Sequence, residues 1–352
     1  MTSTSNTTVM ANSFKNENAT DNVYGIYDQN GLNRIPALIF STTLLVVGTI
    51  GNAHALIINI QRYRERTTRR NNKNPYVVFV LSLAILDLFV CTFVLPLDII
   101  DTCTHFTLLS RDWCKTFRYF QCFLHISSIL HVLVISVHCW RRVCYPHGAQ
   151  IGRTLAVKLC LGCNIFAFFP SIPTAVMSGY ATRIFNGEHG QVCFISDAFN
   201  GTKWPTVYIG LIAIGFAVCV FVICLSYIAL IRFRCQVRHQ RDSTSKKEKK
   251  DTGKTTATLI ILTVIFLVSY IPFLILGLIA AIDENFREGW NVATFATYRI
   301  FARFPHLNNI LNPFIYGCKD PHFKHRLIQM YSPYIPKCFC PKQEENQIEI
   351  SK

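Results

Sequence analysis

Long apolar segments alternate with short polar loops along most of this chain. Seven of these segments reach the length of about 20 residues that an α-helix needs to cross the roughly 30 Å hydrocarbon core of a bilayer. These spans, numbered one to seven in chain order, cover residues 35–61, 75–101, 115–140, 154–178, 205–231, 256–282 and 291–317. The pattern therefore predicts an all-α membrane protein built as a seven-transmembrane helix bundle.

The polar segments at the two ends divide the chain into three parts. Residues 1–34 are expected to form an extracellular N-terminal tail, residues 35–317 the bundle, and residues 318–352 a cytoplasmic C-terminal tail. Of the 352 residues, 51% are hydrophobic and only 16% are charged, which suits a membrane better than an aqueous compartment. The composition thus agrees with the segment pattern.

Basic residues are concentrated in alternate loops. Six Lys or Arg residues follow span one, three follow span three, and the loop after span five contains the run KKEKK, whereas the other three loops together carry four. Since cytoplasmic loops accumulate Lys and Arg, we expect the N-terminus outside the cell and the C-terminus in the cytoplasm. The net charge of +15 is distributed between the spans, which favours membrane lipid over nucleic acid as a partner.

Three N-glycosylation sequons support this orientation. Asn6 in NTT, Asn18 in NAT and Asn200 in NGT all fall on the predicted outer side. We therefore expect a glycosylated protein of the plasma membrane.

Of the 15 cysteines, two stand at positions that predict a disulfide. Cys114 stands at the outer start of span three, and Cys193 lies in the loop between spans four and five. Both face an oxidising compartment, so a bridge between them would hold this loop over the mouth of the bundle. Cys103 is a third outer candidate, and a free Cys193 is the alternative.

An ionisable residue, Asp87, lies in the middle of span two. A charged group costs about 2.5 to 3.5 kcal/mol at the centre of a membrane helix, so Asp87 must face the bundle interior. Ser128 in span three, with Asn308 and Asn312 in span seven, would supply oxygens around the carboxylate, a set that suits a small cation such as sodium. The alternative is a neutral, hydrogen-bonded Asp87 that only ties helices together.

Pro272 in span six and Pro313 in span seven each remove a helical hydrogen bond, which predicts a kink in both spans. Two kinked neighbours joined by a short outer loop could pivot against the bundle. A static kink is the alternative.

The sequence contains no recognisable catalytic or metal-binding constellation. Histidines occur in several spans, but no cysteine or carboxylate completes a zinc set. Motifs for a serine nucleophile, a zinc protease or a phosphate-binding loop do not occur. We therefore expect neither an enzyme nor a metal site, and the hydropathy lacks the repeated halves of a transporter.

Several motifs resemble those of the rhodopsin-like (class A) G-protein-coupled receptors, from span one to the C-terminal tail. Gly51 with Asn52 is similar to that family's span-one signature. The segment LAILD ending at Asp87 resembles its span-two carboxylate, and Cys114 with Cys193 resembles its disulfide. The resemblance implies the seven-helix fold and a role in signal transduction.

Spans six and seven carry two further motifs of this family. FLVSYIP resembles the F-x-x-C-W-x-P switch, with a tyrosine in place of the tryptophan, and NPFIY is similar to N-P-x-x-Y. The switch residues that the resemblance implies are Phe266, Tyr270, Pro272, Pro313 and Tyr316. The segment CKDPHFKHRL that follows resembles the family's short amphipathic eighth helix, with Phe323 as its apolar residue.

The inner end of span three departs most from the family pattern. The family reads D-R-Y, followed by a proline eight residues after the aspartate, and Pro146 fixes this register here. His138, Cys139 and Trp140 therefore occupy the three positions. The arginine that the family presents to its G protein is absent from its usual place, so the chain resembles a divergent member.

Arg142 is the only geometric substitute for the missing arginine. It lies about 60° around the helix from Cys139 and roughly 4.5 Å closer to the cytoplasm. The alternative is that Arg142 is a loop arginine that interacts with anionic lipid headgroups. Tyr227 resembles the span-five tyrosine that meets the family's inner cluster, so part of the transducer-facing apparatus is expected to remain.

The outer halves of the spans would form the ligand crevice. Gln121 stands where amine receptors place an aspartate, and His306 stands where opsins place their retinal-binding lysine. A salt-bridged amine and a Schiff-base chromophore are thus disfavoured, which leaves a peptide or a small polar molecule. Acidic residues near the mouth, Asp98 and Asp101 among them, favour a basic ligand unless they only form a solvated loop face.

The resemblance implies a receptor that binds an extracellular ligand and signals to a cytoplasmic heterotrimeric G protein through a change in helix packing. The missing arginine keeps a second possibility open, a binding-only receptor that acts as a decoy or as a partner of another receptor. A channel or transporter is a third. Cys338 and Cys340, beyond the eighth helix, are candidate palmitoylation sites, with unmodified cysteines as the alternative.

Overall fold

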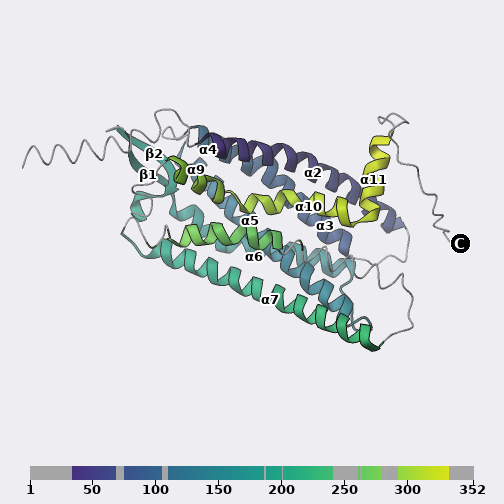
Figure 1. The fold of residues 1–352 in the computed structure, drawn as a ribbon. Helices are drawn as coiled ribbons and strands as arrows, with labels where there is room; N and C mark the ends of the chain where they lie inside the picture. The colour runs from purple at the N-terminus through teal and green to yellow at the C-terminus, as the bar shows by residue number, and fades with distance from the viewer. Residues whose placement is uncertain are drawn as a thin grey trace, which may run out of the picture.

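The computed structural model describes residues 34–68, 75–104, 110–185, 188–199, 201–240, 261, 264–279, 282 and 292–332. In this part of the chain, long helices run side by side as a bundle (Figure 1). A two-stranded hairpin lies at one end of the bundle and the short helix α11 lies at the other (Figure 1). The fold is the all-α helix bundle that the apolar segments predicted.

Within the described residues, five helical units are long and apolar enough to cross a membrane. They are α2 (Ile35–Thr68), the continuous unit of α3 (Tyr76–Phe89), the π-turn η1 (Val90–Val94) and α4 (Leu95–Cys103), then α5 (Arg111–Cys144), α6 (Arg153–Met177) and α7 (Trp204–Gln240). They coincide with spans one to five, which are thereby confirmed. The 34 residues of α5 form a helix about 51 Å long, so it projects beyond a hydrocarbon core of roughly 30 Å.

Spans six and seven contain shorter helices. Helix Val264–Ile279 lies inside predicted span six and continues through Pro272. Span seven consists of α9 (Val292–Phe301) and α10 (Pro305–Lys319), separated by a turn at residues 302–304.

The interruption of span seven is not at the proline that the sequence singled out. The α10 helix continues through Pro313, and the turn lies directly before Pro305. A residue that precedes proline disfavours helical backbone, whereas proline itself fits the first position of a helix. Pro305 therefore explains both the end of the turn and the start of α10.

Large apolar side chains cover the outside of the bundle. On α6, Leu161, Ile165, Phe166 and Phe169 each expose between 56% and 64% of their surface. An apolar surface of this extent would cause aggregation in water, but it is what a helix presents to lipid. The exposed face of α6 thus agrees with a membrane-spanning helix.

Glycine lets α2 approach its neighbours closely. A Cβ atom on Gly48 would lie 2.5 Å from Cys91 Sγ and 2.6 Å from Ile310 Cγ1, which no ordinary packing permits. At Gly51 the nearest atom would be Cγ of Pro313, at 3.2 Å. This close packing buries the side chain of the next residue, Asn52, in the bundle.

The expected eighth helix is present as α11 (Pro321–Tyr331). Its apolar residue, Phe323, is 3% exposed and packs in a cluster with apolar residues of α2 and α3. At the start of the helix, Arg62 Nη1 of α2 lies 2.6 Å from Asp320 Oδ2. Apolar burial and an ion pair thus both attach α11 to the end of α2.

A hairpin occupies the connection between α6 and α7, where the sequence predicted only a loop. Strand β1 (Ser178–Phe185) pairs antiparallel with β2 (Glu188–Ile195), and Tyr180 lies opposite Cys193. The pairing satisfies backbone N–H and C=O groups that a loop would leave to water.

Several predicted positions lie outside the described residues. They are the sequons at Asn6, Asn18 and Asn200 and the tail cysteines Cys338 and Cys340. Tyr316 belongs to α10, but its side chain is also outside the described part of the structure. Glycosylation and palmitoylation at these sites stay predictions.

Candidate functional site

The predicted disulfide is present and joins the start of α5 to the hairpin. Sγ of Cys114 and Sγ of Cys193 are 2.00 Å apart, and both residues are buried. Cys103, the third outer candidate, is a free and exposed cysteine. The prediction of a Cys114 to Cys193 bridge is confirmed, and the bridge holds β2 over one end of the bundle.

An arginine beside this bridge engages the residue that the sequence placed in the crevice. Arg118 Nη1 donates to Gln121 Oε1 at 3.0 Å, and Arg118 Nη2 donates to the backbone carbonyl of Cys193 at 3.0 Å. The same guanidinium lies 4.0 Å from Asp101 Oδ2. Gln121 therefore contacts a cationic side chain. The sequence did not indicate a role for Arg118, because it belongs to no recognisable motif.

The second acidic residue of the predicted mouth, Asp98, is buried in an ion pair. Arg303 Nε donates to Asp98 Oδ2 at 2.7 Å, and Arg303 Nη2 donates to Thr102 Oγ1 at 2.6 Å. Ser41 Oγ of α2 donates to the same carboxylate oxygen at 3.0 Å. This Asp98–Arg303 pair corrects the idea that Asp98 attracts a basic ligand, since its charge is already compensated.

Three buried polar side chains, from α5, helix Val264–Ile279 and α10, lie close together inside the bundle. His125 of α5 lies 5.3 Å from His306 of α10 and 5.7 Å from Tyr270, measured between ring centroids. Among the residues that the structure describes, His125 Nε2, His306 Nδ1 and the Tyr270 hydroxyl have no hydrogen-bond partner, and the three residues expose at most 7% of their surface. We call them the polar floor. Of these, the sequence assigned His306 to the crevice and Tyr270 to the switch, but it gave His125 no role.

The carboxylate predicted to anchor a polar cluster does contact its expected partner. Asn312 Nδ2 donates to Asp87 Oδ2 at 2.7 Å, and the other carboxylate oxygen, Oδ1, is buried without a partner in the described part of the chain. Beside it, Asn308 Nδ2 donates to Ser128 Oγ at 3.2 Å. The structure thus gathers the four predicted residues as two neighbouring pairs, all of them buried.

Two asparagines extend this cluster beyond the predicted set. Asn52 Nδ2 donates to the backbone carbonyl of Asn309 at 2.9 Å, and Ser128 Oγ donates to Asn309 Oδ1 at 3.5 Å. Oδ1 of Asn52 and Nδ2 of Asn309 are buried and find no partner among the described residues. The Gly51–Asn52 signature was a signal for Asn52, whereas nothing in the sequence separates Asn309 from its neighbour Asn308.

The switch residues of span six pack as an aromatic stack. Phe266 and Tyr270 have ring centroids 4.7 Å apart, and Phe216 of α7 lies 5.4 Å from Phe266 and 5.9 Å from Tyr270. The stack touches the polar floor through Tyr270. A displacement of helix Val264–Ile279 would therefore disturb both α7 and the floor.

Near the C-terminal end of α5, the three residues in the D-R-Y positions differ in exposure. His138 is 3% exposed and packs on Phe79, with ring centroids 5.3 Å apart, and Cys139 is 5% exposed in an apolar cluster. Trp140 is half-buried and contacts Tyr145. In this packing, His138 and Cys139 do not present their side chains to a transducer, contrary to the assignment made from the sequence.

The two arginines that follow are exposed, and they differ in their contacts. Arg141 Nε donates to the backbone carbonyl of Ala149, which holds it on the following loop. Arg142, the proposed substitute, is exposed in the last turn of α5. Tyr227 of α7 is buried, and its hydroxyl lies 3.1 Å from Ser136 Oγ of α5. Its transducer-facing role stays a prediction.

Within the described ranges, no three His, Cys, Asp or Glu side chains come together as a metal centre would need. The two histidines of the polar floor are therefore not part of a recognisable metal set. The expectation that the protein has no metal site stays a prediction.

The apolar helices, the bridge from α5 to the hairpin and the carboxylate at the centre of the bundle are the features of a heptahelical membrane receptor. The model of the 7 transmembrane receptor (rhodopsin family) matches residues 56–316, and the chain belongs to this family. It is accordingly a multi-pass membrane protein of a receptor class, and that class is not enzymatic.

Individual relatives are distant but match over most of their length. The chain is 22% identical to galanin receptor 2b of Danio rerio over 325 residues, which covers 92% of this chain and 80% of the relative. It is 24% identical to melatonin receptor type 1B-B of Danio rerio, over 86% of this chain and 82% of the relative. It is 22% identical to the allatostatin-A receptor of Bombyx mori, over 81% of this chain and 76% of the relative.

Proposed function

We propose that this protein is a plasma-membrane receptor with an extracellular N-terminus and a cytoplasmic C-terminus. An extracellular ligand binds between the outer halves of the helices and favours one of two helix packings, and the altered packing is transmitted to a cytoplasmic G protein. A ligand shifts such an equilibrium only through its differential affinity for the two packings. The polar floor is the observation that carries this proposal. Its three unpartnered, buried polar atoms lie against the aromatic stack of span six.

The ligand is a peptide or a small polar molecule. The polar floor offers imidazole and hydroxyl groups, and Arg118 offers a guanidinium beside Gln121. The two carboxylates Asp98 and Asp101 already face Arg303 and Arg118. These pairings remove the reason for the basic ligand expected from the sequence, and the hydrogen-bonding groups of the polar floor and of Gln121 favour a polar ligand instead. The relatives are named for different ligands, galanin, melatonin and allatostatin-A, so their names do not decide the class.

The test begins with a ligand screen on the purified full-length protein, read by a conformational probe on helix Val264–Ile279 rather than by a downstream messenger. A ligand found in this way is then tested for stimulation of nucleotide exchange on each class of G protein. Stimulated exchange supports coupling. A ligand that binds without stimulating any class would overturn it.

One observation favours a binding-only receptor as the second candidate. Cys139, which stands where the family carries its G-protein-facing arginine, is buried in an apolar cluster. A receptor of this kind binds its ligand as a decoy or as a partner of another receptor. The nucleotide-exchange experiment separates it from the first candidate, because only a coupling receptor stimulates exchange.

If Arg142 replaces the missing arginine, Arg142→Ala is expected to abolish ligand-stimulated nucleotide exchange and to leave ligand affinity unchanged. The reason is that Arg142 is an exposed cation close to the D-R-Y positions, and it is remote from the outer crevice. Arg141→Ala is the matched control, since Arg141 is held on the Ala149 carbonyl and should retain exchange. Equal exchange in the two variants would refute the substitute role.

We further propose that the cluster around Asp87 holds a sodium ion. Its residues fit a hard cation, because Asp87 Oδ1 and Asn52 Oδ1 are buried oxygens without hydrogen-bond partners, and the Ser128 hydroxyl lies in the same cluster. Sodium would supply the positive charge that a buried carboxylate lacks here.

Sodium is expected to raise the melting temperature of the purified receptor relative to an equal concentration of N-methyl-D-glucamine, because an ion that binds only the folded state stabilises it. Asp87→Asn should remove this difference and the sodium dependence of ligand affinity. Asp101→Asn is the control, since Asp101 lies near Arg118 and outside the cluster. A melting temperature that is insensitive to sodium in the unmodified protein would defeat the proposal.

A further inference from the structure

One face of α7 is a continuous apolar stripe. Six large side chains, spaced three or four residues apart, each expose 46% to 63% of their surface: Leu211, Ile214, Val218, Phe221, Leu225 and Ile228. From first to last they are separated by 17 residue steps, or about 26 Å of helix, close to the roughly 30 Å thickness of the hydrocarbon core. The stripe therefore faces lipid, and exposed apolar side chains continue to Ile231, which is 45% exposed, so one boundary of the hydrocarbon lies near Ile231. In the orientation proposed above, this is the cytoplasmic boundary.

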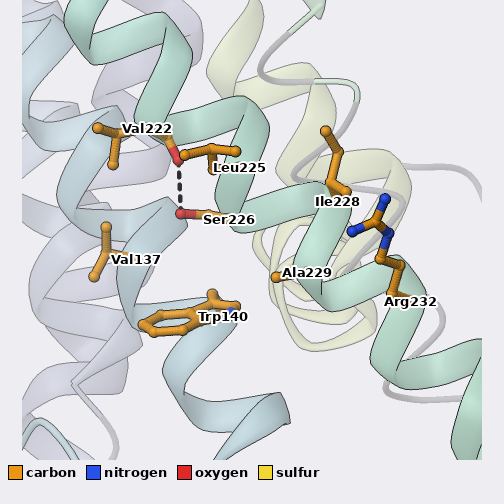
Figure 2. A pocket seen from close by; sticks show the side chains of 8 residues that line it. All are labelled: Val137, Trp140, Val222, Leu225, Ser226, Ile228, Ala229 and Arg232. Atoms are coloured by element: carbon orange, nitrogen blue, oxygen red, sulfur yellow. Dashed lines mark hydrogen bonds between the residues drawn. The ribbon is translucent and has the colours of Figure 1, made fainter.

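At this end of the stripe, a cavity of about 510 Å³ opens between α5 and α7. Figure 2 shows Val137 and Trp140 on α5 and Val222, Leu225 and Ile228 on α7 around it. Leu225 and Ile228 also belong to the stripe, so the cavity opens to the lipid.

The wall of this cavity is apolar in effect, although it contains a serine. Ser226 Oγ donates to the backbone carbonyl of Val222 at 2.8 Å, so its hydroxyl is satisfied within the helix (Figure 2). A polar ligand would find no free donor on this hydroxyl, whereas a hydrocarbon chain needs none. The lining therefore favours an apolar occupant.

A cation stands at the cytoplasmic edge of the cavity. Arg232 lines it and directly follows Ile231, the last of these exposed apolar residues, which places it at the level of the lipid headgroups. Trp140, close to the C-terminal end of α5, also lines the cavity, and tryptophan is enriched at the membrane–water interface because its ring is apolar and its N–H is polar. An apolar cavity in contact with lipid, ending in an arginine, matches the two parts of an anionic phospholipid.

We propose that this cavity binds one acyl chain of an anionic glycerophospholipid of the cytoplasmic leaflet, with Arg232 on the headgroup phosphate. The site rests on the orientation proposed above, but not on ligand binding or coupling. Trp140 is the last residue in the D-R-Y positions, and the preceding Cys139 packs in the core. A lipid in this cavity thus touches the inner end of α5 at the segment that departs most from the family.

The test uses quenching of tryptophan fluorescence by brominated lipid. Full-length receptor is reconstituted in phosphatidylcholine nanodiscs, and phosphatidylserine or phosphatidylcholine with brominated acyl chains is added in increasing proportion. The signal of Trp140 is obtained by subtracting that of Trp140→Phe. Phosphatidylserine is expected to reach half-maximal quenching at a mole fraction about five-fold lower than phosphatidylcholine, which is the effect of one cation at the membrane surface.

Variants separate the headgroup contact from the cavity. Arg232→Gln should remove the preference for phosphatidylserine, whereas Lys158→Gln, the same loss of charge at an exposed position of α6 outside the cavity, should retain it. Ala229→Phe fills the cavity and should weaken quenching by both lipids, with the melting temperature verifying that each variant folds.

Three results would overturn the proposal. The first is equal quenching by the two lipids, which would indicate contact with bulk lipid alone. The second is a preference for phosphatidylserine that survives Arg232→Gln, and the third is full quenching in Ala229→Phe. None of these measurements involves the ligand or a G protein, so failure of coupling would leave the lipid result unaffected.

Discussion

Replacing Arg303 by methionine is expected to lower the free energy of unfolding by about 3 to 5 kcal/mol, the usual effect of removing one partner of a buried ion pair. The side chains of Arg303 and Asp98 are only 10% and 7% exposed, and their atoms approach to 2.7 Å. Methionine retains much of the arginine volume but leaves the Asp98 carboxylate buried, with Ser41 as its remaining hydrogen-bond donor. The measurement is denaturant unfolding of the purified receptor in detergent micelles.

Two matched variants separate this account from a general effect of losing an arginine. Arg326→Met makes the same change in the ion pair with Glu65, whose side chains are 41% and 53% exposed, and should cost less than about 1 kcal/mol. Adding Asp98→Leu to Arg303→Met should recover most of the loss, because no uncompensated charge is left in the bundle. Equal losses in the two single variants, or no recovery in the double variant, would contradict the account.

The Asp98–Arg303 pair also illustrates why part of the structure could not be predicted. The spans could, because each must be long and apolar enough to cross lipid, and this condition applies to every segment separately. The pairing of two charges 205 residues apart depends on how helices are rotated and where one of them breaks. The break before Pro305 could not be predicted either, since the sequence indicated only a kink at Pro313.

Part of the polar cluster could be predicted, because a carboxylate buried in a membrane helix needs hydrogen-bond partners. Asp87 in mid-span demanded hydrogen bonds from other spans, and Asn312 supplies one. Asn308 and Asn309 are adjacent, and they therefore differ by about 100° around the helix. Both contact Ser128, Asn308 as donor and Asn309 as acceptor, which only the rotation of α10 could reveal.

The inner end of α5 shows a different limit. Pro146 gave the register of His138 and Cys139, but their burial depends on neighbours on several sides, because α5 packs against α3, α6 and α7. A helix surrounded in this way has no single apolar stripe that indicates which side faces inward. The sequence thus shows which residues occupy the D-R-Y positions, whereas their exposure could not be predicted from it.

Removing the disulfide by Cys193→Ser is expected to lower the free energy of unfolding by about 2 to 5 kcal/mol. The bridge joins residues 79 positions apart and so restricts a long loop of the unfolded chain. The native state also loses the attachment of β2 to α5. Because Arg118 donates to the carbonyl of Cys193, the guanidinium beside Gln121 should lose its fixed position, and ligand affinity should fall as well. Denaturant unfolding without reductant measures the first effect, and hydrogen exchange of residues 178–195 measures the release of the hairpin.

Cys103→Ser provides the matched control, since Cys103 is an exposed free cysteine at the same end of the bundle, and its substitution should change stability by less than about 0.5 kcal/mol. Cys114→Ser should match Cys193→Ser, and the double variant should cost no more than either single one, because both substitutions remove the same bond. Additive losses would mean that the two cysteines contribute through packing rather than through the bridge. A loss in Cys103→Ser as large as in Cys193→Ser would show that the bridge has no special part in stability.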